Sequence, residues 1–226
     1  MGDLSVVQFR PTGQSVIRQG TKSVSVQERS RSRRQRLLDA ARTVFTEQGY
    51  NATPIDDIAR ASDTSKGGVY FHFPSKQALF LALLDESSAA LRENIESAMA
   101  SEPDPLLRGE AALRAVMTSF AEHRLLARLL LVEAAGAGRD FNLAMADMHE
   151  QFALLIASCL DEAVAAGRIA PLDTQFTARA WYGAVNHIVL HWLQTGEPAD
   201  LEGSFPLLRD LLLVGVTGRE KARSWS

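Results

Sequence analysis

The sequence predicts an all-α protein of about nine helices. From Arg33 onward, apolar residues recur every three or four positions, which is the spacing of one face of a helix. Glycine, proline and helix-capping residues separate these runs, and no alternating run is long enough to predict a strand. A chain of 226 residues is long enough to bury a sizeable core in one or two domains.

Residues 1–30 are predicted to be a disordered N-terminal arm. The segment is polar, rich in Ser, Gln, Gly and Val, and shows no sustained period. The alternating run from Ser23 to Val26 is too short to predict a strand. The first helix follows the arm, with an apolar stripe through Leu37, Val44 and Phe45, and Gly49 is expected to end it.

Residues 53–76 predict two short helices joined by a tight turn. Thr53 is expected to cap the first of them, and Thr64 or Ser65 the second. Asp63 stands where the turn needs a left-handed backbone, which a short polar side chain tolerates. This pattern is a helix-turn-helix, which places its second helix in the major groove of DNA. We therefore predict a three-helix DNA-binding domain over residues 31–76.

The second short helix is expected to bind DNA. Residues 64–68 would read bases, while Tyr70, His72 and Lys76 would contact phosphates, which fix register but carry little sequence information. Phe71 and Phe73 are expected to point inward; the alternative is that the whole aromatic run only fills the core. The predicted DNA-binding residues are Arg33, Arg34, Thr53, Thr64, Ser65, Lys66, Gly67, Gly68, Tyr70, His72 and Lys76.

The charge distribution agrees with a DNA-binding end. Residues 1–76 hold 12 Lys and Arg against 7 Asp and Glu, and residues 77–226 hold 12 against 20, so the two parts carry +5 and −8. Only one end is thus expected to face a polyanion. The basic density is highest at Arg29, Arg31, Arg33, Arg34 and Arg36. A charge run alone is often solvated surface, but here it predicts salt-dependent attraction to phosphates.

Residues 77–226 predict a second, helical domain. Ser75 is expected to cap a long fourth helix that leaves the first domain, and the next helix begins after Asp104 and Pro105. An apolar stretch from Leu125 to Val132 precedes a long helix that Gly167 closes. Asp173 can cap the following helix, which reaches Thr195, and a last helix covers about 202–217.

The last two helices are apolar on more than one face, which predicts burial against a second copy of the chain. The predicted dimer-interface residues are Ala184, His187, His191, Phe205, Leu208 and Leu212. Because His187 and His191 are four residues apart, they also have the spacing of metal ligands. No carboxylate or thiol nearby in sequence completes such a site, so we expect no metal and no other cofactor.

Residues 33–80 resemble the DNA-binding domain of the TetR family of bacterial regulators. The similarity follows one order along the chain: Phe45 to Tyr50, Ala52-Thr53, Ile58-Ala59, Lys66 to Phe73, and Ser75 to Leu79. The sequence departs from the family at Pro54, Asp63 and Thr64, where Thr or Ser, Gly and an apolar residue are usual. The resemblance implies a homodimer that binds a palindromic operator through two such domains and is regulated by a small-molecule effector.

The resemblance also implies an effector site inside the C-terminal helices. Its candidate residues are Met117, Phe120, Glu133, Phe152 and Trp181, and ordinary core packing is the alternative for each. The apolar character of these helices favours a small hydrophobic effector. Cys159, the one cysteine, allows no internal disulfide and lies on an apolar stripe.

The sequence predicts a cytoplasmic transcriptional repressor that is not an enzyme. No apolar run is long enough to span a membrane, and no motif for a phosphate loop or a nucleophile elbow is present. Two alternatives remain at this level. The chain could be a ligand-independent DNA-binding adaptor or structural protein, or a ligand-binding helical domain whose DNA-binding module is vestigial.

Overall fold

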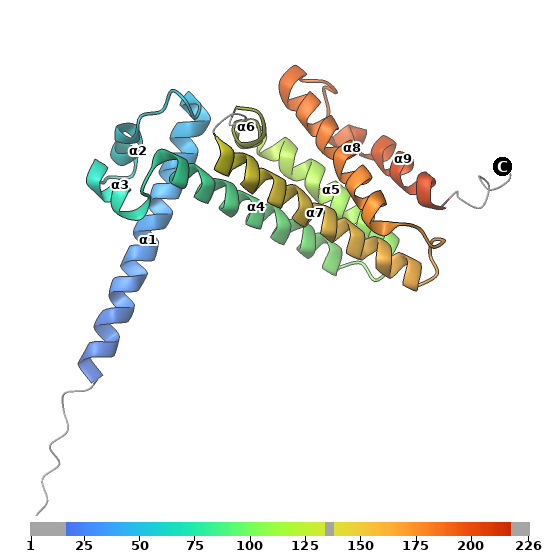
Figure 1. Cartoon of the computed structure of the whole chain (residues 1–226), viewed down its shortest axis with the longest axis horizontal. Coiled ribbons are helices and arrows are strands. Elements are labelled where there is room, and N and C mark those ends of the chain that lie inside the picture. Colours follow the sequence, from blue (N-terminus) through green and yellow to red (C-terminus); the bar gives the residue numbers. More distant parts are fainter. Residues whose placement is uncertain (1–16, 134–137, 218–226) are drawn as a thin grey trace, which may run out of the picture.

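Helices make up all the regular structure in the described part of the chain, residues 17–133 and 138–217, of this computed structural model (Figure 1). The all-α prediction is confirmed. The elements are α1 (Ile17–Gln48), α2 (Ile55–Ala61), α3 (Lys66–His72), α4 (Lys76–Ala100), α5 (Pro105–Glu122), α6 (Arg124–Arg128), the π-helical turn η1 (Leu129–Glu133), α7 (Arg139–Ala165), α8 (Thr174–Thr195), the 3-10 turn η2 (Glu202–Ser204) and α9 (Phe205–Thr217).

Most of the predicted helix ends are confirmed by hydrogen bonds and backbone angles. The side chain of Ser65 accepts a hydrogen bond from the Gly68 amide at 3.1 Å. Three further predicted caps do the same for their own helices, namely Ser75, Asp104 and Asp173. Asp63 takes the left-handed conformation expected of it, with φ of 51°.

The N-terminal arm differs from the prediction. Helix α1 begins at Ile17, so residues 17–30 are helical where we predicted disorder. Once residues after Arg33 are held in a helix by their buried face, each added turn costs only propagation and not nucleation. Gln, Glu and Arg between 27 and 36 are also good helix formers. Residues 1–16 of the predicted arm lie outside the described residues.

The capping role predicted for Thr53 is wrong. Pro54 occupies the cap position of α2, with no side-chain hydrogen bond. The Thr53 hydroxyl instead donates to the Gly49 carbonyl at 2.7 Å, and the residue is only 1 % exposed. Its side chain is used to close the turn between α1 and α2, so it faces inward.

One hydrophobic core joins the DNA-binding helices to the rest of the protein. Phe45 of α1 and Phe80 of α4 are fully buried, with ring centroids 5.5 Å apart. The ring of Phe80 also lies 5.7 Å from that of Phe141 in α7. Leu129 and Leu130 of η1 belong to the same cluster. Helices α1 to α3 therefore pack on the C-terminal helices through a continuous apolar contact.

Helix α4 runs out of the N-terminal helices and into the C-terminal bundle, where it packs on α5 and α7, and α8 in turn packs on α7 (Figure 1). Two further apolar clusters hold this bundle. One surrounds Met117, Trp192 and Phe205, and the other surrounds Leu160 and Ala178. Within the residues described, no helix is both long and apolar enough to cross a membrane.

Candidate DNA-binding surface, ligand cavity and dimer face

The surface of α3 is the candidate DNA-reading surface. Val69 and Phe73 are buried against α1 and α2, whereas Tyr70 is 43 % and Phe71 is 82 % exposed. The prediction that Phe71 points inward is therefore wrong. Positions 69 and 73 are four residues apart and share the inner face, so residue 71 falls on the opposite side of the helix. Phe71 is a surface residue that the sequence reasoning missed.

The first turn of α3 carries the small and basic residues expected there. Lys66 is exposed, and its ammonium lies 2.8 Å from the Asp56 carboxylate of α2. The hydrogen bond and the charge of Asp56 raise the pKa of Lys66. A Cβ atom at Gly68 would lie 2.5 Å from the Thr64 hydroxyl oxygen, so the backbone approach at this position favours glycine.

Lys76 has a different environment from the one predicted for a phosphate contact. Its ammonium donates to the carbonyl oxygens of Tyr50 at 2.8 Å, Thr53 at 3.1 Å and Asn51 at 3.3 Å. It also lies 4.7 Å from the centre of the Tyr50 ring. Burial lowers the pKa of Lys76. All three donors of the ammonium thus have acceptors within the protein, and Lys76 holds the loop between α1 and α2 on the start of α4.

Two arginines of α1 lie beside the end of α3. The Arg34 guanidinium lies 5.0 Å from the centre of the Phe73 ring, and both Arg33 and Arg34 are exposed. Burial, together with the charges of these two arginines, lowers the pKa of His72. This shift favours the neutral form of His72, which can donate one hydrogen bond, while Arg33 and Arg34 supply the positive charge beside it.

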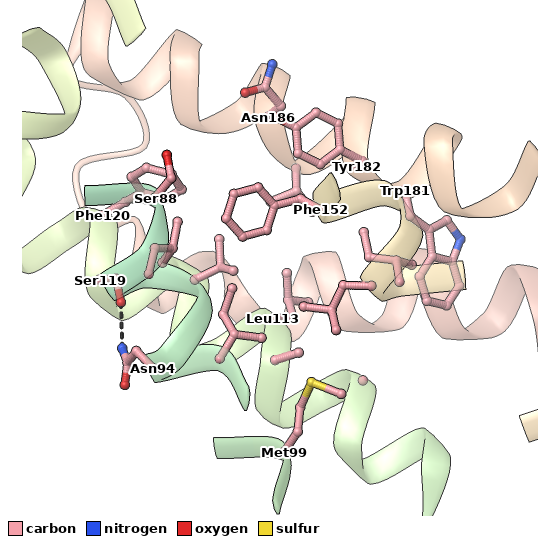
Figure 2. A pocket seen from close by; sticks show the side chains of 18 of the residues that line it. Ser88, Asn94, Met99, Leu113, Ser119, Phe120, Phe152, Trp181, Tyr182 and Asn186 are labelled. Atoms are coloured by element: carbon pink, nitrogen blue, oxygen red, sulfur yellow. Dashed lines mark hydrogen bonds between the residues drawn. The ribbon is translucent and has the colours of Figure 1, made fainter. Parts of the chain in front are cut away.

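A cavity of about 500 Å³ opens between the helices of the C-terminal bundle (Figure 2). Its wall is mostly apolar and comes mainly from α4, α5, α7 and α8. Phe120, Phe152 and Trp181, three of the five predicted effector residues, line it. A volume of this size is typical of sites for small organic ligands.

The structure places the other two predicted effector residues outside this cavity. Met117 is 1 % exposed and belongs to the apolar cluster around Trp192 and Phe205, on the side of α5 next to the cavity-lining stripe. Glu133 lies in η1, where its carboxylate is 3.4 Å from Arg128. Neither position could be assigned from helical spacing alone, because the rotation of each helix about its axis is set by its neighbours.

A few polar groups interrupt the apolar wall, and the sequence reasoning missed them. Asn94 of α4 donates to the Ser119 hydroxyl of α5 at 2.7 Å (Figure 2). Ser88 of α4 contacts the Met148 sulfur at 3.0 Å. Burial raises the pKa of the Tyr182 phenol, another lining group. Such scattered donors in an apolar wall suit a ligand with a long apolar part and few polar atoms.

Cys159 also lines the cavity, although the sequence favoured a core position for it. Burial raises the pKa of its thiol, so the uncharged form is favoured. A protonated thiol is a weak nucleophile, and in this wall it acts as a small apolar group.

The faces of α8 and α9 that remain exposed form the candidate dimer face. On α9, Leu207 is 76 %, Leu211 66 % and Val214 64 % exposed. Phe176 on α8 is 72 % exposed, and the predicted interface residues His187 and His191 are exposed too. These side chains leave a large apolar area without cover in the single chain.

The predicted interface face of α9 is corrected by the structure. Phe205, Leu208 and Leu212 are buried within the chain itself, and Ala184 on α8 is half-buried. Because α9 is apolar on both sides, its sequence could not indicate which side faces inward. Across the described ranges, no cluster of three or more His, Cys, Asp or Glu residues is arranged to hold a metal ion.

Sequence models of known families match both parts of the chain. The model described as bacterial regulatory proteins, tetR family, matches residues 37–83, and a tetracyclin repressor-like C-terminal domain matches residues 104–201. The chain belongs to the TetR family. It is a DNA-binding transcriptional regulator of the helix-turn-helix type.

Relatives of this TetR-family regulator are similar over most of their length. An uncharacterized HTH-type transcriptional regulator, YhgD of Bacillus subtilis, is 23 % identical over 185 residues, which are 82 % of this chain and 97 % of that protein. The transcriptional repressor DhaR of Mycobacterium sp. is 28 % identical over 174 residues, covering 74 % and 86 %.

Solved structures share the fold of this TetR-family regulator. FadR from Bacillus subtilis in complex with stearoyl-CoA superposes with a TM-score of 0.73 at 19 % identity, covering 80 % of this chain and 98 % of FadR. FadR from Bacillus halodurans, a fatty acid degradation regulator, gives a TM-score of 0.72 at 22 % identity with the same coverage. The matches extend over both the DNA-binding and the C-terminal helices.

Proposed function

We propose that this TetR-family regulator is a homodimeric repressor that leaves a palindromic operator when a small hydrophobic or amphipathic effector enters the cavity. The observation that carries the proposal is the apolar cavity of about 500 Å³ beside α4, the helix shared by the DNA-binding and C-terminal parts. The protein would work in the cytoplasm as a binding protein and not as an enzyme. Residues up to about 76 would contact DNA, and residues 77–226 would bind the effector and the second copy of the chain.

The proposed DNA-contacting surface combines α3 with the part of α1 around Arg33 and Arg34, just before the first buried residues of that helix. Lys66, Gly67 and Gly68 would approach base edges, with Thr64 and Ser65 at the same helix end. Tyr70, His72, Arg33 and Arg34 would contact phosphates. Phe71 adds an exposed apolar ring, which suits a thymine methyl group. We leave out Thr53, which is buried, and Lys76, whose donors are already used.

The proposed dimer pairs the exposed faces of α8 and α9 with those of a second copy. Leu207, Leu211 and Val214 would enter the interface, with His187 and His191 beside them. A two-fold axis through this face makes the contact self-complementary. The two α3 helices would then address half-sites about 34 Å apart, one turn of DNA.

The proposed effector has a long apolar part. FadR of Bacillus subtilis, which shares the fold, was solved with stearoyl-CoA, and the cavity of the present chain is lined by side chains that suit an acyl chain. The effector would favour a dimer in which the α3 helices are wrongly spaced for the operator. Each 1.4 kcal/mol of preference between the two states shifts their ratio about tenfold, so a few kcal/mol would suffice.

Binding to DNA from upstream of the protein's own gene tests the repressor proposal. Wild type should bind one palindromic site saturably, with affinity that falls as salt rises. Lys66→Ala should weaken binding and lower the salt slope by roughly one, because it removes one positive charge from the DNA-facing surface. Tyr70→Ala should weaken binding and leave the salt slope nearly unchanged, because the phenol is uncharged. Arg179→Ala, a surface change in α8 far along the chain from α3, is the control. If no fragment selected from the whole genome binds better than random DNA, the repressor proposal is wrong.

Filling the cavity tests the effector proposal. A Cβ atom at Gly109, which lines the cavity, would meet no atom within 4 Å, so there is room for a larger side chain. Gly109→Leu should block release of the operator by an aliphatic effector, while Gly109→Ala, which makes the same backbone change with little volume, should still respond. Equal response of both variants would place the effector elsewhere. A ligand-independent adaptor would show no effector response in any variant.

A further inference from the structure

The cavity reaches the DNA-binding helices through one side chain, Arg42 of α1. Among the described residues that line the cavity, every other one lies between residues 84 and 213. Arg42 also pairs with Glu86 of α4, whose neighbours Ser87 and Ser88 line the cavity. A group bound at Arg42 would therefore contact the cavity and α1 at the same time.

The hydrogen bonding of Arg42 is incomplete. Its Nη2 atom lies 3.4 Å from the Glu86 carboxylate, and its Nη1 atom lies 3.9 Å from Asp39, which are long distances for charged pairs. The Nε atom of Arg42 is buried and has no hydrogen-bond partner, and the buried Oε2 atom of Glu86, which faces Nη2 at 3.4 Å, accepts no hydrogen bond either. A buried donor without an acceptor is unfavourable, so this guanidinium has unused capacity for an anion.

The other arginine of the cavity wall differs in this respect. Arg209 of α9 donates to the adjacent Asp210 through Nε at 2.9 Å and Nη2 at 2.6 Å. The hydrogen bond and charge of Asp210, with a further contribution from Glu110, raise the pKa of Arg209. Its guanidinium fork is already occupied by a carboxylate. Of the two arginines, Arg42 is the one that can accept a new anionic partner.

We propose that Arg42 binds the anionic head group of an amphipathic effector whose aliphatic tail lies in the cavity. This inference rests on the proposed effector function and adds the chemistry of the head group. A carboxylate or phosphate offers two oxygens to a guanidinium fork, whereas Glu86 offers Arg42 one oxygen, Oε2, at 3.4 Å. The head group replaces Glu86, which keeps its 2.6 Å hydrogen bond from Gln35 of α1. The ligand thereby changes a direct link between α1 and α4.

Two probes with the same tail and different heads test the proposal. Binding of dodecanoate and dodecanol to the full-length protein is measured by calorimetry and by the change in tryptophan fluorescence, to which Trp181 in the cavity wall contributes. Wild type should bind dodecanoate about tenfold or more tightly than dodecanol. Arg42→Met should remove this preference and leave dodecanol binding unchanged. Arg42→Lys keeps the charge and should retain part of the preference.

Glu86→Gln provides a second, independent arm. Because Glu86 competes for Arg42, its neutralisation should tighten dodecanoate binding and leave dodecanol binding as in wild type. Dodecanoyl-CoA, tested in parallel, distinguishes a free carboxylate from the phosphates of a carrier. If Arg42→Met weakens the binding of either anion, the head-group site is supported. Thermal melting shows whether each variant is folded. If Arg42→Met is unfolded, the proposal is tested with Arg42→Lys and Glu86→Gln.

Two results would overturn the head-group site while leaving the proposed function intact. In the first, dodecanol binds wild type as tightly as the anions do. In the second, Arg42→Met weakens both probes equally. If no probe binds wild type and none releases the operator, the proposed effector function fails together with the head-group site.

Discussion

The DNA-binding helices and the C-terminal bundle use apolar side chains in opposite ways. In the first region, Phe45, Tyr50 and Phe80 fill the core, with ring centroids 4.6 to 5.6 Å apart. In the second, four long helices enclose a cavity of about 500 Å³. The second region also leaves Leu207 and Leu211 exposed on its outer face.

This difference agrees with what each region must do. A surface that reads DNA has to hold its donors in fixed positions, and a close-packed interior resists deformation. A region that binds a ligand needs an unfilled volume, and unfilled volume loses dispersion contacts. The bundle would regain stability from a bound effector and from a second chain. Helix α4 belongs to both regions, so a change in the hollow region can move the filled one.

The largest effect is expected when a phenylalanine is removed from the filled core. Phe45→Ala should lower the free energy of unfolding by about 4 kcal/mol, because the ring is fully buried among other rings. Phe152→Ala, which removes the same side chain from the cavity wall, should cost about 2 kcal/mol. Denaturant unfolding of both variants measures the two values. Equal losses would show that the two regions are packed alike.

A charge on the exposed face of α9 should break the dimer. Leu211→Glu would place a carboxylate in each half of the interface and should weaken dimerisation on the order of 100-fold. Leu125→Glu on α6 is the matched control, because Leu125 is 65 % exposed and Leu211 is 66 % exposed. Sedimentation at several concentrations measures the dimer. The interface lies elsewhere if Leu125→Glu dissociates the protein and Leu211→Glu does not.

Substitutions of Lys76 and Lys66 should show that the first lysine stabilises the fold and that the second binds DNA. Lys76→Met leaves three loop carbonyls without their donor and should lower the free energy of unfolding by about 2 kcal/mol. Lys66→Met removes only a solvent-exposed pair with Asp56 and should leave the free energy of unfolding close to that of wild type.

In DNA binding, the order of the two effects should be reversed, with the larger effect in Lys66→Met. Lys66→Met should lower the salt slope of operator binding, and folded Lys76→Met should keep it. A lower slope for Lys76→Met would mean that its ammonium leaves the loop to bind a phosphate.

The smallest effect concerns pH and the bundle. Burial lowers the pKa of His149, whose Nε2 atom is buried without a partner and whose ring lies 5.2 Å from that of Tyr182. Below the unfolded pKa of about 6.5, the unfolded chain binds a proton that the folded chain does not, so stability falls as pH falls. His149→Phe should lose less stability than wild type between about pH 7.5 and 5.5, as measured by thermal melting. If both proteins lose the same stability as the pH falls, the pH dependence does not come from His149.

Local chemistry accounts for what could be predicted along the chain. Ser65, Ser75, Asp104 and Asp173 cap helices through amides two or three residues away, so their roles are visible in the sequence. The order of short motifs through the helix-turn-helix is equally local, and it pointed to the TetR family. The sequence signal for the cavity was weaker, since bulky residues such as Phe120 and Phe152 are also common in ordinary cores.

The features that failed prediction depend on contacts between distant segments. Lys76 meets carbonyls 23 to 26 residues earlier, and no pattern around Lys76 reveals them. On α9, both faces are apolar, and burial of Leu208 against the bundle decides that Leu211 is outside. Short-range hydrogen bonds and periodicity thus determine where helices begin and end. Their rotation, the volume left between them and the partners of long side chains are decided only when the helices pack together, because those contacts join residues far apart in the chain.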